Sequence, residues 1–270
     1  MLIRLGYDIG FSLPAPTPIM ALLHVHPSRT ADLREPDLMS ATPVEKFAIF
    51  EDFFGNRCTR FFATGDQLSL TGSCIIESAE TPDPAAFGAA QLPIEDLPSD
   101  TLQFLLSSRY CEVDSMSSIA IDLFSHTPPG WERVVAICDW VNARVRFGYH
   151  HARATRTALE VFVERVGVCR DFQHLAVTLC RAMNIPARYA TGYLGDIGVP
   201  PSPNPMDFSA WFEVYLGDRW WTCDARHRMP RIGRVLMAVG RDAADVALTT
   251  SFGQTTLERF QVTTEVIAGV

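Results

Sequence analysis

The stretch TALEVFVERVGVCRDFQHLAVTLCRAMNIP, residues 157–186, decides the fold of the chain. Thr157 and Glu160 form a capping box, which predicts the start of a helix. Gly167 is expected to supply the left-handed residue that ends this helix. A second helix is predicted to begin at or just after Cys169, because apolar residues recur at helical spacing over residues 172–183. The stretch therefore indicates two helices that meet at a cysteine.

The predicted position of Cys169 favours a chemical role for its thiol. The first N–H groups of a helix have no partner within the helix, and the positive end of its dipole attracts negative charge. A thiol at this place is expected to have a lowered pKa, and the same N–H groups can bind an oxyanion. The alternative is that Cys169 is a small buried core residue, as many free cysteines are.

Three further sequence segments come after the Cys169 segment: IPARYATGY at 185–193, AWFEV at 210–214 and WWTCD at 220–224. Together with the Cys169 segment they resemble the bacterial transglutaminase-like family, over roughly residues 130–230. The resemblance implies a papain-type α+β domain with a cysteine nucleophile. It also implies an N-terminal β domain.

The first part of the chain is predicted to be antiparallel β. Apolar and polar residues alternate over 3–11, and a turn signal at Gly65-Asp66 separates candidate strands at 57–63 and 67–77. Short strands at this spacing are typical of a sandwich. A proline-containing stretch at 78–100 is predicted to be a linker. The fold class is therefore α+β, with a β-sandwich domain and linker at 1–100 and a transglutaminase-like domain at 101–270.

Composition narrows the classes of partner and cofactor. A net charge of −8 argues against nucleic acid as a partner. No signal peptide or apolar span is seen, so we expect no membrane partner. Seven cysteines without repeated spacing indicate reduced thiols in a cytoplasm. No cofactor or metal is expected: ordinary strand histidines are favoured over a metal pair at His24 and His26. The oligomeric state stays open.

Residues 209–216 and 219–224 are predicted to form a hairpin around Gly217-Asp218, which makes Ser209 and Asp224 diagonal neighbours on one face. The resemblance implies a histidine directly before Ala-Trp and an aspartate at the end of the next strand. Asp224 matches the aspartate, but Ser209 stands in the histidine position. Serine cannot act as a base near neutral pH. The triad of cysteine, histidine and aspartate that the resemblance implies is therefore incomplete at these positions.

Three groups of histidines are candidates for the missing base. His227 is ranked first, because it can turn back toward the site if the strand ends at Asp224; in a continued strand it would face away from Ser209. His174 lies about 140° round the helix from Cys169 and should not reach the thiol. The sequence does not place His150 and His151.

Two functions follow from this site. The first is a cysteine acyltransferase or amide hydrolase that forms a thioester on Cys169, with Asp224 and His227 as its catalytic partners and a peptide or protein amide as its substrate. The second is a catalytically silent transglutaminase-like protein that uses the same cleft for binding. Ser209 is the residue that favours the second function.

Overall fold

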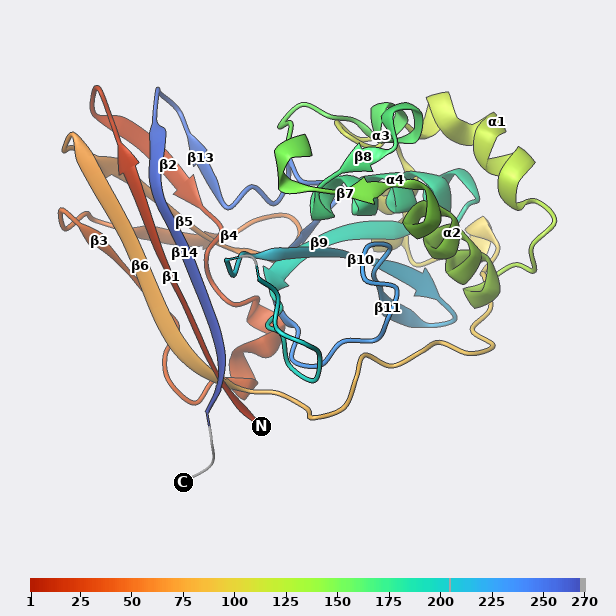
Figure 1. Ribbon diagram of the computed structural model, residues 1–270, viewed down its shortest axis with the longest axis horizontal. Coiled ribbons are helices and arrows are strands. Elements are labelled where there is room, and N and C mark those ends of the chain that lie inside the picture. The colour runs from red at the N-terminus through yellow and green to blue at the C-terminus, as the bar shows by residue number, and fades with distance from the viewer. Residues whose placement is uncertain (204, 268–270) are drawn as a thin grey trace.

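A two-layered antiparallel β-sandwich forms one half of the protein (Figure 1). The computed structural model describes residues 1–203 and 205–267. One sheet has the strand order β14-β1-β6-β3 and the other β13-β2-β5-β4. The strands are β1 (Leu2–Ser12), β2 (Thr17–Ala21), β3 (Leu38–Thr42), β4 (Ala48–Glu51), β5 (Arg57–Ala63), β6 (Gln67–Glu77), β13 (Thr249–Ser251) and β14 (Thr256–Ile267).

Strand β1 lies between β6 and β14, and its alternating pattern buries Ile3, Leu5 and Ile9 against the second sheet. β14 pairs with β1 along almost its whole length, from Leu2↔Ile267 to Ser12↔Thr256. β13 likewise pairs with β2. Residues 249–267 thus complete the sandwich, whereas the sequence placed them in the second domain, because pairing between distant strands leaves no local signal.

The other half of the protein combines helices with a third antiparallel sheet, of order β11-β10-β9-β12. Its helices are α1 (Val113–Phe124), α2 (Trp131–Arg144), α3 (Ala158–Glu164) and α4 (Cys169–Ala182). Its strands are β7 (Arg146–Phe147), β8 (Val166–Gly167), β9 (Ala187–Tyr193), β10 (Ser209–Leu216), β11 (Arg219–Cys223) and β12 (Val235–Gly240). Short 3-10 helices cover Pro27–Asp32, Ile94–Asp96, Ser99–Leu105 and Tyr149–His151. The predicted α+β class is confirmed.

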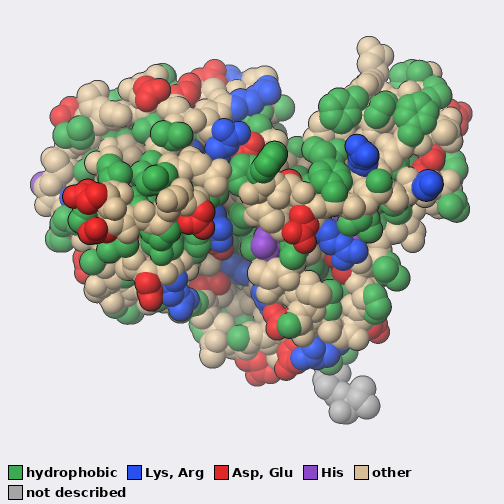
Figure 2. Space-filling model, turned by 180° about the vertical axis from the view of Figure 1, so that it is seen from behind, with side chains coloured by type: hydrophobic (Ala, Val, Ile, Leu, Met, Phe, Trp, Pro, Cys, Tyr) green, Lys and Arg blue, Asp and Glu red, His purple; other side chains and the backbone are tan. Residues whose placement is uncertain are grey.

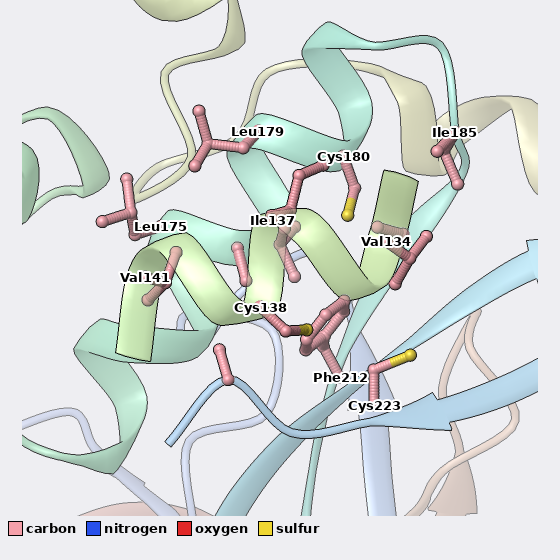
Figure 3. Close-up of a cluster of buried hydrophobic side chains, with 14 of the residues drawn as sticks. Val134, Ile137, Cys138, Val141, Leu175, Leu179, Cys180, Ile185, Phe212 and Cys223 are labelled. Atoms are coloured by element: carbon pink, nitrogen blue, oxygen red, sulfur yellow. The ribbon is translucent and has the colours of Figure 1, made fainter. Parts of the chain in front are cut away.

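Helix α4 is the centre of this half. Every residue from Asp171 to Arg181 is buried, because α1, α2 and α3 pack around the helix and β9 and β10 cover its remaining side. Figure 3 shows the contact of α2 with α4, with Ile137 of α2 near Cys180 of α4, and with Cys138 pointing toward Phe212 of β10. A helix buried on all sides cannot shift without opening the core. The cysteine at its first position is therefore held rigidly.

The predicted linker at 78–100 is docked on the helical half. The Trp131 N–H donates to the Ala89 carbonyl at 3.1 Å, and the Gly217 N–H donates to the Ala90 carbonyl at 2.9 Å. The sandwich core also continues into the β11-β10-β9-β12 sheet, where Tyr193 of β9 and Met237 of β12 join it. The two halves thus share packed surface. In the described part of the chain no helix is long and apolar enough to cross a membrane.

The helix boundaries near the cysteine follow the sequence with one exception. The capping box between Thr157 and Glu160 is present at the start of α3. The expectation for Gly167 is wrong: Arg165, with φ of 57°, is the left-handed residue that ends α3. Gly167 lies in β8, where a side chain would approach the Asp171 Cβ to 2.6 Å. The glycine is needed there for close packing.

Candidate active site

Cys169 is the first residue of α4, and a buried ion network fixes the loops around it. The Asp171 carboxylate accepts the Val168 N–H at 2.9 Å and so closes the start of the helix. The same carboxylate binds Arg156 at 3.1 Å and Arg170 at 3.0 Å. Since Asp171 is fully buried, these contacts tie the loop before α3 to the cysteine.

The Cys169 thiol is distinct from the other cysteines. It is partly exposed, whereas the remaining six are buried, and all seven are free. The backbone N–H groups of Ala210 and Arg170 lie close enough to its sulfur to oppose a rise in the pKa of the thiol. Donors that point at a sulfur favour the thiolate and are placed to bind an oxygen that develops negative charge beside it.

The environment of Cys169 nevertheless raises its pKa. Burial is the main cause, and the nearby Asp207 carboxylate acts in the same direction. The Arg226 guanidinium and the two backbone N–H groups oppose the shift without cancelling it. The lowered pKa expected from the helix start is therefore not found, because desolvation outweighs the helix terminus. A thiol of this kind needs a base to remove its proton.

The chain turns back directly after β11, because the Asp224 side chain caps the turn. Its Oδ1 accepts the Arg226 N–H at 2.9 Å and the His227 N–H at 3.0 Å. Its Oδ2 lies 2.8 Å from Nδ1 of His227. With Nδ1–H donating to the carboxylate, Nε2 of the imidazole is the nitrogen able to accept a proton.

Asp224 is itself held from two sides. The Gln173 amide donates to its Oδ1 at 3.1 Å, and Arg234 binds its Oδ2 at 2.8 Å. Burial alone would raise the pKa of Asp224, but the hydrogen bond from His227 and the charge of Arg234 outweigh it. The pKa therefore lies well below the usual range. A permanently ionised carboxylate is what a histidine needs to keep its orientation.

Cys169, Ser209 and His227 line one cavity with a volume of about 100 Å³. The other lining residues described are Tyr149, Leu194, Asp196, Ser202, Pro205, Met206, Asp207, Phe208, Arg226 and Arg231. The Ser209 hydroxyl is buried and has no hydrogen-bond partner within the described residues. Figure 2 shows a hollow between the two lobes of the protein where basic, acidic and histidine side chains gather. The structure thus brings three of the four predicted site residues to one cavity, with Asp224 behind His227.

The other histidines weighed for the base lie elsewhere. His174 is buried, stacks on Tyr110 and accepts the Ala243 N–H at Nε2. Burial lowers its pKa well below the ordinary value, and the charges of nearby arginines add to the shift. The rings of His150 and His151 pack on each other and are absent from the described lining of the cavity.

His24 and His26, predicted to lie in a strand, come after the end of β2 at Ala21, and each has its own partners. His24 is hydrogen-bonded to Asp37 and Thr59, whereas His26 is bonded to Ser28. Within residues 1–203 and 205–267, no three histidine, cysteine or acidic side chains gather as metal ligands would.

Sequence reasoning missed Asp207, Arg226 and Tyr149. All three line the cavity of Cys169, and each affects the charge of the thiol or is affected by it. They come from three separate loops, so no spacing in the sequence connects them. The position of Arg226 between Asp224 and His227 was the one available signal, because a residue in that turn must lie close to the site.

Alkylation rates should distinguish Cys169 from the other thiols. We expect iodoacetamide to label Cys169 first in the folded protein, because it is the one partly exposed cysteine. Burial raises the pKa of Cys58 and of Cys111 to about 11, so these thiols should react slowly. Time-resolved peptide mass spectrometry near neutral pH measures the order. Labelling of Cys58 or Cys111 at the same rate as Cys169 would contradict this view of the site.

Comparison with known proteins identifies the family. A sequence model described as the transglutaminase-like superfamily matches residues 118–225. A solved structure from Cytophaga hutchinsonii, named a "Putative Cysteine Protease", is 31% identical, with a TM-score of 0.87 over 100% of this chain and 92% of its own. The chain belongs to the transglutaminase-like superfamily. An uncharacterized protein of Mycobacterium leprae, ML0607, is a more distant relative, 24% identical over 76% of this chain and 75% of its own length.

The predicted resemblance is therefore confirmed, and the protein has the fold of a family of cysteine-type enzymes. The match to the Cytophaga protein spans both halves, so the sandwich belongs to the shared architecture. The resemblance implied the chain order cysteine, histidine, aspartate, whereas the side chains that meet beside this cavity follow in the order Cys169, Asp224, His227. The roles of these residues stay a prediction.

Proposed function

We propose that the protein is a cysteine acyltransferase or amide hydrolase that works through a thioester on Cys169. The observation that carries the proposal is the 2.8 Å contact between His227 Nδ1 and Asp224, which supplies an oriented imidazole in the cavity of the thiol. The histidine implied at position 209 is thereby replaced from another point of the chain. Equivalent triads are known to occur in different chain orders.

The reaction follows from these positions. Nε2 of His227 takes the thiol proton, and the Cys169 sulfur attacks the carbonyl carbon of the amide. Backbone N–H groups beside the thiol, from Arg170 and Ala210, stabilise the oxyanion. The C–N bond then breaks, and the leaving amine takes the proton from His227. Water or a second amine next attacks the thioester and releases the acyl group. The substrate is a peptide or protein amide, and the free thiols favour a reducing, cytoplasmic setting.

The second candidate is a silent protein that binds in the same cleft, and Ser209 is the observation that favours it. The substitution Ser209→His separates the two. If His227 already acts as the base, a histidine at 209 adds little and crowds the cavity. If the protein is silent for lack of a base, the new imidazole should raise turnover by about 10² to 10⁴.

The assay is ammonia release from a glutamine-containing peptide by wild type, Ser209→His and Cys169→Ala. We expect Cys169-dependent turnover in the wild type that Ser209→His fails to increase. A wild type without turnover, together with an active Ser209→His variant, would establish the silent protein instead.

A further inference from the structure

The cavity around Cys169 contains four charged side chains besides His227, and two of them already have partners. Arg231 lies 3.5 Å from Asp196 and donates to the Gly195 carbonyl at 2.9 Å. The second oxygen of Asp196 accepts the Ser202 N–H at 2.6 Å. This pair therefore belongs to the wall of the cavity, and its charges are compensated within the protein.

The other two charges, Arg226 and Asp207, form no such close contact, although the Arg226 charge acts on Asp207 and opposes the rise that burial causes in the pKa of its carboxyl. Both line the cavity, and among the described residues no ion pair within 4.0 Å involves either of them. Arg226 lies over the Phe147 ring at 3.8 Å, and it opposes the rise that burial causes in the pKa of the neighbouring Tyr149. Burial raises the pKa of Asp207, and the backbone of Phe208 opposes this shift without cancelling it. Asp207 precedes β10 and Arg226 follows β11, so the cavity offers one anion and one cation at the open end of the β10–β11 hairpin.

The Asp207 carboxylate disfavours the thiolate form of Cys169, because its negative charge raises the pKa of the thiol. A substrate that carries a cationic group would neutralise this charge when it binds. Arg226 is suited to an anionic group instead, because the N–H donors of its guanidinium bind a carboxylate through charge-assisted hydrogen bonds. A ligand with only one charge would leave the other side chain unpaired in a partly dry site, which is unfavourable.

We propose that this cavity binds the zwitterionic head of a free α-amino acid, with its carboxylate on Arg226 and its ammonium on Asp207. The substrate class is then the side-chain amide of a free amino acid, such as a γ-glutamyl amide, whose carbonyl reaches Cys169. Glutamine within a peptide chain carries neutral peptide groups at the same places and leaves both charges unpaired. This inference rests on the proposed function, since it names the acyl group that the thioester would carry.

The reaction balances without a further reagent. The Cys169 sulfur forms a bond to the γ-carbonyl carbon, and the C–N bond of the amide breaks as the amine leaves with one proton. Water then attacks the thioester, so that free glutamate and the thiol are released.

The test uses four p-nitroanilides of the γ-carboxyl of L-glutamate: unmodified, α-methyl ester, N-acetylated, and carrying both modifications. We expect the wild type to prefer the unmodified anilide over each singly modified one by about 10- to 100-fold in kcat/KM, the range for a charge-assisted hydrogen bond. Arg226→Gln should remove the preference against the ester and keep the preference against acetylation. Asp207→Asn should do the reverse.

Surface substitutions of the same kind, Arg144→Gln and Asp218→Asn, serve as controls and should keep both preferences, because both side chains are exposed and outside the cavity. Equal kcat/KM values for all four anilides with Cys169-dependent release would overturn the zwitterion site and leave the thioester mechanism standing. Release that persists in Cys169→Ala would overturn the thioester mechanism. Absence of Cys169-dependent release from the unmodified anilide, with release of ammonia from a glutamine-containing peptide, would also overturn the zwitterion site.

Discussion

Cys169→Ala is expected to lower amide turnover by about 10³-fold or more, the largest effect of any substitution considered. The sulfur is the atom that bonds to the acyl group, and the described lining of its cavity contains no second thiol that could replace it. Protein stability should change little, because the side chain is small and partly exposed. Single-turnover release of ammonia or p-nitroaniline measures the loss.

Cys74→Ala is the matched control, since Cys74 is buried in the sandwich core and outside the cavity. It should retain wild-type turnover, with circular dichroism showing that both variants are folded. Turnover in Cys169→Ala within a few-fold of the wild type would show that a residue other than this thiol performs the chemistry.

His227→Gln is expected to lower kcat by about 10²- to 10⁴-fold, the usual contribution of a positioned acid–base group. The glutamine amide can still donate to Asp224, so the turn after β11 should persist. What is lost is the nitrogen that accepts the thiol proton. A thiol whose pKa is raised by burial depends strongly on such a base.

The control for this substitution is His126→Gln, because His126 is exposed after α1 and distant in sequence from the site. Its turnover should equal that of the wild type. If His227→Gln and His126→Gln were equally active, the imidazole on Asp224 would be a structural element only, and the base would have to be sought among other groups.

Much of the fold could be predicted from local sequence patterns, such as turn residues and the alternation of apolar and polar residues. The boundaries of β5, β6 and β10 match the sequence expectation residue by residue, because turn glycines and strict alternation define them. The capping box at Thr157 likewise depends on neighbours only. In contrast, the addition of β14 to the first sheet depends on pairing across more than 240 residues, which periodicity cannot reveal.

The helix and strands that form the site could be predicted from the sequence, whereas the charges around Cys169 and their effect on its pKa could not. The helix start at Cys169 and the hairpin ending at Asp224 follow from pattern, and they bring the right segments together. The position of His227 depended on where β11 ends, and the Asp224 side chain decides this by binding two N–H groups of the turn. The raised pKa of Cys169 was missed, because burial and the charge of Asp207 arise only in three dimensions.

The most direct test of the mechanism is to find the acyl group during turnover. Wild-type protein mixed with a glutamine-containing peptide or a γ-glutamyl anilide is quenched in acid, where thioesters persist, digested with pepsin and analysed by mass spectrometry. The predicted result is the mass of the acyl group on the peptide that contains Cys169, at a level that falls when the substrate is exhausted. An acyl group on a different residue, with turnover preserved in Cys169→Ala, would contradict the mechanism.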